Sequence, residues 1–241
     1  MAALTPVTRA VAEELCWVSV DPAACPAAKA ATELRCTETA TVLRLAGRFT
    51  GTATRLVLVA ELDHAVVGVR LRDQLALIAG RSCAIGLTGS GHGERRMIIS
   101  SGVAALTQRL GLLDQRGRLV RGLPTPAEGY IDRAVAAAVW RGAFLARGRL
   151  SDPGDEPRVT VVCPGPETAR VLAGAAGWLR VPARWQPASR AGAELVVVEG
   201  EDEVAALLVA LGAPTTSAIW HRQRRARSGA TASGAGVRGR G

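Results

Sequence analysis

The sequence has few aromatic residues and no long apolar run. Aromatics make up only 3% of the 241 residues while apolar residues reach 48%, so Ala, Val and Leu must fill the core. No apolar run approaches the roughly 18–20 residues that a membrane-spanning helix needs. Glu13 and Glu14 interrupt the start of the chain, where an export signal needs an uninterrupted apolar stretch. We therefore expect a cytoplasmic protein without a membrane partner, made of one large domain or two small ones.

Cysteine and histidine are too sparse to build a metal centre. The five cysteines form an odd set with no C-x-x-C pair, which fits neither a disulfide framework nor a zinc finger. Only three histidines occur, which excludes a His-rich metal site. The sequence predicts no metal, no cofactor, and buried reduced thiols at the five positions: Cys16, Cys25, Cys36, Cys83 and Cys163.

Lysine is almost absent, because Lys29 is the single lysine among 30 basic residues. The formal net charge of +9 is concentrated near the C-terminus: residues 221–241 hold six arginines and no acid, which leaves +3 for residues 1–220. Such a basic segment makes nucleic acid a candidate partner, although composition alone is weak support.

An internal repeat is the most informative feature of the chain. Residues 103–111 read VAALTQRLG and residues 204–212 read VAALLVALG, an offset of 101. The same offset places Gly47, which ends one helical stretch, on Gly148, which ends another. The apolar run at 55–62 likewise falls near that at 158–165, so the sequence indicates a duplication.

Hydrophobic periodicity predicts the same elements in both copies. In the first copy it predicts helices at 36–47, 64–79 and 103–113 with strands at 54–61, 82–88 and 95–100; in the second, helices at 131–148, 166–180 and 201–211 with strands at 158–163, 183–189 and 194–199. The predicted fold is an α/β sandwich, a pseudo-twofold duplicated α-β-α-β-β-α domain preceded by an N-terminal helix.

Turn and linker signals divide the chain. We expect an N-terminal helix and linker at 1–30, a first half at 31–114, a Gly-, Pro- and Arg-rich linker at 115–130 and a second half at 131–213. A basic terminal helix at 214–227 should follow, then a disordered tail at 228–241, where Gly, Ser and Ala without periodicity bury little surface.

Small residues near the ends of two predicted helices suggest a close helix–helix seam. They would let the helices approach more closely than leucines can: Ala46, Gly47, Gly142, Ala143 and Gly148. The alternative is two ordinary core helices with glycine C-caps. The repeat favours a seam at the centre of a duplicated domain.

Three segments occur together and in order: GLLDQRGRLVRGLP (111–124), WRGAFLARGRLSDP (140–153) and CPGPE (163–167). With them the chain, from about Pro6 to Arg227, resembles the WhiA family of bacterial regulators of sporulation and cell division. The resemblance implies a degenerate domain similar to LAGLIDADG homing endonucleases, with DNA binding and transcriptional control. The family continues into a C-terminal helix-turn-helix domain, which we expect to be missing here because the similarity fades after WHRQRRARS (220–228).

The resemblance also implies where nuclease chemistry would lie. LAGLIDADG nucleases carry an acidic residue just before the last glycine of each central helix, and these carboxylates hold divalent metals. The corresponding positions are Ala46 and Arg147, so one ligand is absent and the other is a cation. We therefore expect no catalytic residue and no enzyme activity; a residual metal-dependent endonuclease is a remote alternative.

Other motifs have ordinary structural readings. GSGHG (89–93) fits a hairpin turn better than a phosphate loop, and Asp63 with His64 fits a helix N-cap with a surface histidine better than acid–base chemistry. EGEDE (199–203) suits a helix start. Four tryptophans are expected as core or seam anchors, with base stacking as the alternative: Trp140, Trp178, Trp185 and Trp220.

The best candidates for phosphate contact are the arginines of the basic terminal helix, Arg222, Arg224, Arg225 and Arg227; the alternative is a solvated helix end. We expect a non-catalytic regulator, associated with the nucleoid in the cytoplasm, that binds DNA weakly or without sequence specificity. The competing reading is an interaction module with a regulatory protein as its partner and only incidental DNA contact.

Overall fold

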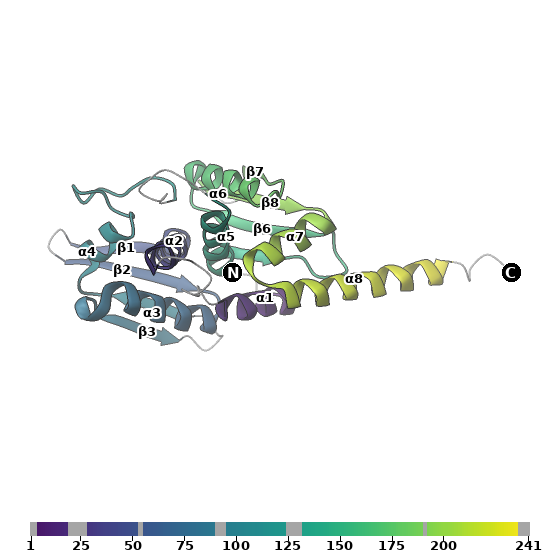
Figure 1. Ribbon diagram of the computed structural model, residues 1–241, viewed down its shortest axis with the longest axis horizontal. Helices are drawn as coiled ribbons and strands as arrows, with labels where there is room; N and C mark the ends of the chain where they lie inside the picture. Colours follow the sequence, from purple (N-terminus) through teal and green to yellow (C-terminus); the bar gives the residue numbers. More distant parts are fainter. Residues whose placement is uncertain are drawn as a thin grey trace.

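The structure of the protein is a computed structural model, and it describes residues 4–18, 28–52, 55–89, 95–123, 132–189 and 192–235 (Figure 1). Two helices, α2 and α5, lie side by side in the middle of the molecule, with one four-stranded antiparallel sheet on either side. None of the described helices is both long and apolar enough to cross a lipid bilayer.

The first half runs from α2 to α4. Its elements are α2 (Ala28–Ala46), β1 (Gly47–Thr52), β2 (Arg55–Leu62), α3 (Ala65–Ala79), a 3-10 turn (Gly80–Ser82), β3 (Ile85–Gly89), β4 (Arg95–Ile99) and α4 (Val103–Arg109). The strands pair in the order β1-β2-β4-β3.

The second half repeats this plan. Its elements are α5 (Arg133–Arg147), β5 (Gly148–Leu150), β6 (Arg158–Cys163), α6 (Pro166–Trp178), β7 (Arg184–Pro187), β8 (Glu194–Glu199) and α7 (Glu201–Leu211). The strand order β5-β6-β8-β7 matches that of the first sheet. Gly47 lies opposite Ala60, and Gly148 lies opposite Val161, so the offset of 101 holds in the strand register as well. The duplicated α/β fold is thereby confirmed.

Each half holds one strand more than the expected α-β-α-β-β-α order. β1 and β5 follow the central helices without a break, so the order is α-β-β-α-β-β-α. Their sequences, GRFTGT and GRL, are short and show little apolar alternation. They become strands because β2 and β6 offer them a paired edge, which is a tertiary effect that local periodicity does not report.

The core is continuous from one half to the other and is built mainly from Ala, Val and Leu. In β2, for example, Leu58, Ala60 and Leu62 face the core, and the alternate residues face away. The helices cover this inner face of each sheet, which leaves the opposite face open. The large side chains that complete the core include Trp140 and Trp220, both fully buried.

Two of the four tryptophans expected as anchors are not buried. Trp178 is 48% exposed because it ends α6, and Trp185 is 41% exposed because it lies on the edge strand β7. The expectation for these two positions is therefore corrected.

Helix α1 (Pro6–Cys16) closes the open edge of β5. Thr5 caps the helix by accepting a hydrogen bond from the Thr8 amide at 3.2 Å. The Thr8 hydroxyl accepts from the Leu150 amide at 2.9 Å and donates to the Leu150 carbonyl at 3.1 Å. This covers backbone groups that would otherwise remain unpaired at a sheet edge.

Helix α8 (Pro214–Ala235) is anchored at its start and extends beyond the rest of the molecule (Figure 1). The Glu14 carboxylate accepts hydrogen bonds from the amides of Thr215 and Thr216 at 2.9 and 2.7 Å, and the Trp220 indole donates to the Ser151 carbonyl at 3.0 Å. The helix continues past Arg227 to Ala235, which corrects the expected disorder over 228–235. The anchored first turn offsets the free-energy cost of helix nucleation. Each further residue then extends the helix and adds one backbone hydrogen bond.

Several expectations fall partly outside the described residues. The N-terminal linker after Val18, residues 90–94 of the predicted hairpin turn, Cys25, residues 124–131 of the inter-half linker and residues 236–241 all lie there. Of the remaining cysteines, Cys163 is buried, whereas Cys16, Cys36 and Cys83 are half-buried, and all four are free thiols.

Candidate nucleic-acid interface

The last turns of α2 and α5 lead directly into the strands of the two sheets. A Cβ on Gly47 would lie 2.3 Å from the Leu43 carbonyl oxygen, and one on Gly148 would lie 2.6 Å from Phe144 Cα. Both glycines are therefore required by the turn from helix to strand. The close approach between the two helices occurs at Gly142, where a Cβ would lie 2.5 Å from the Glu38 carbonyl oxygen.

The remaining predicted seam residues, Ala46 and Ala143, are buried at 4% and 0% exposure. Of the five small residues proposed for the seam, the described geometry thus places Gly142 directly at the crossing. A Cβ on Gly47 or Gly148 would instead clash with the last turn of the preceding helix, and one on Gly47 would also lie 3.2 Å from Leu58 Cδ1 of β2.

Arg147, at the second degenerate position, is paired with an acid from the other half. Its Nη1 lies 3.3 Å from Asp63 Oδ1 and donates to the Glu61 carbonyl at 3.2 Å. Arg149 Nη2 binds the other oxygen, Asp63 Oδ2, at 2.7 Å. The Asp63 carboxylate is therefore already neutralised by two guanidinium groups.

These residues do not fit the metal centre of a nuclease. The Ala46 side chain offers no ligand atom, and Arg147 places a positive charge where a metal-binding carboxylate would be needed. Within the described ranges, no three His, Cys, Asp or Glu side chains gather in a way that could hold a metal ion.

His64, rather than Asp63, caps helix α3. Its Nδ1 accepts a hydrogen bond from the Val66 amide at 3.2 Å. Its ring is only 12% exposed and lies 3.4 Å from Glu13 Oε1. Burial lowers the pKa of His64 even though Glu13 opposes the shift. The expectation of a surface histidine is corrected, because α1 covers this end of α3.

The open faces of the two sheets carry arginines in strand positions that alternate with the buried residues. On the first sheet Glu61 lies 3.0 Å from Arg48 and 3.4 Å from Arg96. On the second sheet Glu199 likewise pairs with two arginines, one of them at 3.7 Å. Arg149 of β5, which pairs with Asp63, belongs to the same set. We call the five residues of this set the sheet-face arginines: Arg48, Arg96, Arg149, Arg158 and Arg184.

The sheet-face arginines outnumber the acids that they contact and lie close to solvent. Their side-chain exposures range from 32% at Arg149 to 77% at Arg184. Exposed ion pairs contribute little to stability, so an incoming phosphate can replace the glutamate at small cost. Arg48 and Arg149 are related by the offset of 101 and are the second residues of the corresponding strands β1 and β5. This relation could have identified the two arginines from the sequence. The predicted phosphate contacts were instead the arginines of the C-terminal helix, because basic residues are concentrated there.

The arginines of α8 have unequal surroundings. Arg224 is 14% exposed, lies 3.5 Å from Glu201, donates to the carbonyls of Pro153 and Asp155, and stacks 5.1 Å from the Trp220 ring centre. It is thus engaged in holding α8 against the body. The other three, Arg222, Arg225 and Arg227, are exposed. Glu201 itself belongs to the acidic first turn of α7, as expected from EGEDE.

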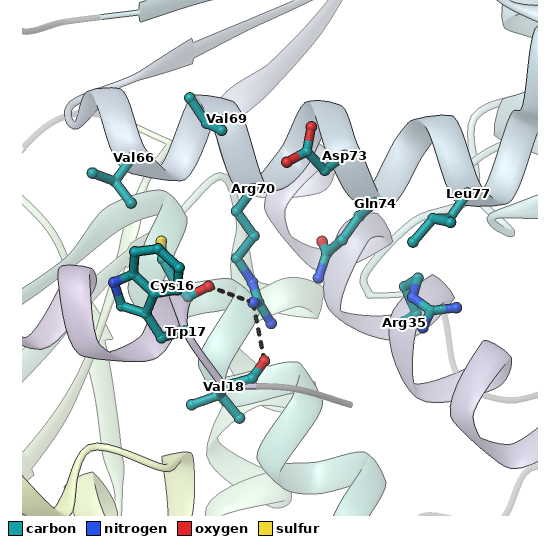
Figure 2. A pocket seen from close by; sticks show the side chains of 10 residues that line it. All are labelled: Cys16, Trp17, Val18, Arg35, Val66, Val69, Arg70, Asp73, Gln74 and Leu77. Atoms are coloured by element: carbon teal, nitrogen blue, oxygen red, sulfur yellow. Dashed lines mark hydrogen bonds between the residues drawn. The ribbon is translucent and has the colours of Figure 1, made fainter. Parts of the chain in front are cut away.

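An apolar groove of about 390 Å³ lies between the end of α1 and helices α2 and α3 (Figure 2). Trp17 is 84% exposed, Leu77 70% and Val69 41%, and all three line this groove. At its base Arg70 donates to the carbonyls of Cys16 and Val18 at 2.9 and 3.0 Å. Burial raises the pKa of the Cys16 thiol to about 12, so this cysteine remains protonated at neutral pH.

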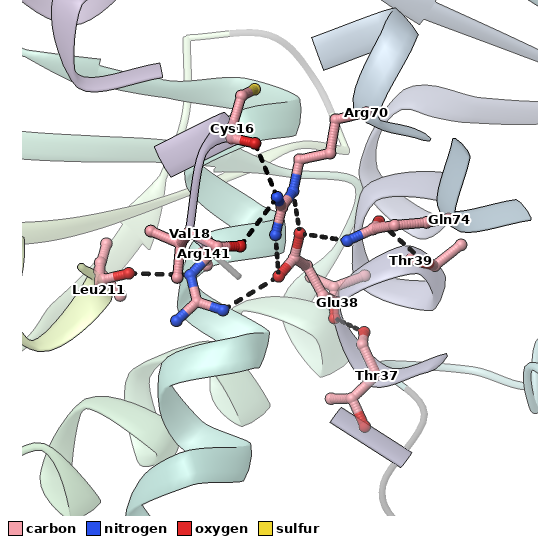
Figure 3. A network of polar contacts seen from close by, with 10 residues as sticks. Cys16, Val18, Thr37, Glu38, Thr39, Arg70, Gln74, Arg141 and Leu211 are labelled. Atoms are coloured by element: carbon pink, nitrogen blue, oxygen red, sulfur yellow. Dashed lines mark hydrogen bonds and ion pairs between the residues drawn. The ribbon is translucent and has the colours of Figure 1, made fainter. Parts of the chain in front are cut away.

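A buried ion-pair network behind this groove joins the two halves (Figure 3). Glu38 of α2 is fully buried and accepts two hydrogen bonds from Arg70, at 2.7 and 3.1 Å. It also accepts from Gln74 at 2.8 Å and from Arg141 of α5 at 3.1 Å. Arg141 in turn donates to the Leu211 carbonyl at 2.8 Å.

The network keeps Glu38 ionised. Burial alone would raise the pKa of its carboxyl group, but the hydrogen bonds and charge of Arg70, the charge of Arg141 and the Gln74 amide hold that pKa below its usual value. No motif in the sequence pointed to this network. The available signal was a glutamate placed among the threonines of a helix that must be buried at the centre of the fold.

Comparison with known proteins places this architecture in a family. The sequence model of the WhiA LAGLIDADG-like domain matches residues 136–229. A probable cell division protein WhiA of Micrococcus luteus is 40% identical over 225 residues, which cover 92% of this chain and 66% of that protein. The chain belongs to the WhiA family.

Other WhiA relatives give the same result. The protein of the same name from Arthrobacter sp. is 40% identical over 197 residues, 79% of this chain and 59% of that relative. The chain therefore spans slightly less than two thirds of the length of these WhiA proteins.

Solved structures confirm the fold. Full-length DUF199/WhiA from Thermatoga maritima superposes with a TM-score of 0.66 at 13% identity, covering 90% of this chain and 65% of that one. The homing endonuclease I-DmoI, solved in complex with DNA and Mn, superposes with a TM-score of 0.51 at 10% identity, covering 73% and 97%. At such identities the likeness shows that this WhiA-family chain shares the LAGLIDADG fold.

Proposed function

We propose that this chain is a non-catalytic DNA-binding regulator of cell division and sporulation that acts on the nucleoid in the cytoplasm. The observation that carries the proposal is that alanine and arginine stand at the two acidic positions at the centre of a LAGLIDADG fold. Where the nucleases hold metal-binding carboxylates, this chain has Ala46 and the Asp63-paired Arg147. A scaffold of this kind can hold DNA and lacks the ligands to cleave it.

The charge of the open sheet faces supports DNA contact. The five sheet-face arginines contact four acids, Glu61, Asp63, Glu156 and Glu199, and the excess positive charge lies on the first sheet, where Arg48 and Arg96 share Glu61. Phosphate contacts supply affinity without sequence information, so binding should be weak, salt-sensitive and poorly specific. The exposed arginines of α8 (Arg222, Arg225 and Arg227) are a second candidate set of phosphate contacts.

The experiment measures the affinity of the full chain for a duplex of about 30 base pairs across a salt series. If all five sheet-face arginines neutralise a phosphate, the log–log slope is on the order of −4.5, from about −0.9 per contact. The double variant Arg48→Gln/Arg149→Gln should make the slope less steep by about 1.8. The matched control Arg222→Gln/Arg225→Gln removes the same charge from α8 and should have the smaller effect.

Two results would contradict this proposal. A slope near zero, or no retention of DNA at about 50 mM salt, would remove DNA binding altogether. A loss confined to the α8 variant would move the interface from the sheet faces to α8. Catalysis is tested separately by plasmid nicking with Mg²⁺; nicking that survives Arg147→Ala and depends on another carboxylate would establish a nuclease.

The groove in Figure 2 supports a second candidate function, docking of a regulatory protein. Trp17 and Leu77 present large apolar surfaces to solvent beside a cavity of about 390 Å³. Co-purification of a stoichiometric protein that is lost in Trp17→Ala/Leu77→Ala, together with absence of DNA binding, would favour this function. Trp185→Ala, which changes an exposed tryptophan of the second sheet, is the control.

A further inference from the structure

A second cavity, of about 400 Å³, lies where the end of α2 and the start of β1 meet the start of α6 and the loop after α4 (residues 112–121). Three arginines from separate parts of the chain line it: Arg44 from α2, Arg48 from β1 and Arg121 from the loop. The acid that lines it is Glu167, in the first turn of α6. The charged side chains around the cavity therefore sum to a net positive charge.

The pseudo-twofold symmetry relates this cavity to a closed site in the other half. The offset of 101 carries Gly47 onto Gly148, Arg48 onto Arg149 and Pro164 back onto Asp63. The related site leaves only about 10 Å³, because α1 fills it with Thr8 and Ala12. No helix fills the cavity beside Arg48 in the part of the chain that the structure describes.

The two related sites also differ in their anions. Asp63 supplies a carboxylate that binds Arg149 at 2.7 Å and Arg147 at 3.3 Å. Its counterpart Pro164 supplies no anion to the open cavity. The carboxylate that lines the open cavity is instead Glu167 of α6, and Arg48 also pairs with Glu61 at 3.0 Å.

Arg44 has an unmet requirement for an acceptor. Its Nε is buried and has no hydrogen-bond partner among the described residues. Burial lowers the pKa of the Arg44 guanidinium, and the nearby charge of Glu167 opposes that shift only in part. A buried guanidinium donor without an acceptor is costly, which indicates that an acceptor group belongs in this place.

We propose that this cavity binds a phosphate group, held by Arg44, Arg48 and Arg121. The planar guanidinium donates paired hydrogen bonds that match the oxygens of a phosphate. The volume lies within the range of small-molecule sites, about 300–1,000 Å³, so a phosphorylated compound of nucleotide size can enter. The bound phosphate would occupy the place that the Asp63 carboxylate takes in the other half.

The test is calorimetric titration of the full chain with inorganic pyrophosphate in the absence of DNA. Wild-type protein should bind one equivalent. Arg44→Met, which keeps the apolar stem, and Arg121→Gln should each weaken binding about tenfold. Arg116→Gln is the matched control, because Arg116 is an exposed arginine of the same loop that does not line the cavity.

A variant that is expected to strengthen binding keeps the test independent of folding defects, because a misfolded protein would bind more weakly. Glu167→Gln removes the acid of the cavity wall and should strengthen pyrophosphate binding about threefold or more. The proposal is overturned by no saturable binding up to about 10 mM, by wild-type affinity in both arginine variants, or by weaker binding in Glu167→Gln.

The phosphate could belong to a small molecule or to the DNA backbone, and a competition experiment distinguishes them. If the DNA backbone occupies the cavity, saturating duplex displaces pyrophosphate, and Arg44→Met makes the salt slope of DNA binding less steep by about 1. If a small molecule occupies it, pyrophosphate binds equally well with and without duplex. Because pyrophosphate binding is measured without DNA, it succeeds or fails independently of the proposed regulator function.

Discussion

At the scale of single residues, the most consequential side chain is the buried Glu38. Taking a carboxylate out of water costs several kcal/mol, and the interior offsets this cost only where charge and hydrogen bonds are complete. Arg70 and Arg141 supply the charge, while Gln74 supplies a further donor. The two guanidinium groups depend on Glu38 in the same way, since both are nearly buried, at 12% and 11% side-chain exposure.

Replacing Glu38 by glutamine should therefore destabilise the fold strongly. Glu38→Gln leaves two buried guanidinium groups without their counter-charge, and the expected loss is about 3–5 kcal/mol in the free energy of unfolding. Urea denaturation measures it. Asp73→Asn, which changes an exposed acid on the neighbouring helix, should shift the free energy by less than about 0.5 kcal/mol. Similar losses in the two variants would contradict a structural role for the network.

The same residue predicts a dependence of stability on pH. The pKa of Glu38 is lower in the folded protein than in the unfolded chain, so near pH 4 the unfolded chain binds more protons. The stabilisation from Glu38 is thus complete above the unfolded pKa of about 4.3 and is lost as the pH falls through the folded value. Urea midpoints between about pH 3 and 7 should fall less steeply toward acid in Glu38→Gln. An equal acid dependence would refute this assignment.

At the scale of elements, the crossing of α2 and α5 depends on one glycine. A Cβ at Gly142 would lie 2.5 Å from the Glu38 carbonyl oxygen and 2.9 Å from Thr41 Cβ. Backbone cannot yield as a flexible side chain can, so the two central helices would have to separate. Such a separation would also move Arg141 away from Glu38, because Arg141 precedes Gly142 on the same helix.

A pair of glycine substitutions tests this crossing. Gly142→Ala should lower the free energy of unfolding by about 1–3 kcal/mol through overpacking. Gly174→Ala, inside α6 where a Cβ would meet nothing within 4 Å, should raise it by about 0.4–1 kcal/mol because alanine favours the helix. Thermal and urea unfolding measure both variants. Stabilisation by Gly142→Ala would show that the helices do not approach closely at this position.

Elements with a strong local pattern could be predicted from the sequence, and those made by distant contacts could not. Helix α3 and strand β6 lie close to their expected ranges because their apolar periodicity is complete. β1 and β5 exist through pairing with β2 and β6, and α8 is fixed at its start by Glu14, about 200 positions away in sequence. The partners of Glu38 lie 32 to 103 positions away, so spacing along the chain does not reveal them.

At the scale of the whole molecule, the two halves share one hydrophobic core. The core extends without interruption from Val11 in α1 to Trp220 in α8. Helix α1 binds β5 of the second half through Thr8, and the carbonyls at its end accept from Arg70 of the first half. If one half unfolded alone, the apolar surface that the other half buries against it would therefore become exposed to water.

We therefore expect a single unfolding transition that does not separate the halves. Trp140 belongs to α5 of the second half and the Trp220 indole donates to the Ser151 carbonyl of that half, so both buried tryptophans report on it by fluorescence, whereas far-ultraviolet circular dichroism reports on the helices of both halves. The two midpoints in urea should coincide. Glu38→Gln changes a residue of the first half, yet it should lower the tryptophan midpoint as much as the dichroism midpoint. A two-step dichroism curve with an unchanged tryptophan midpoint would mean that the halves unfold independently.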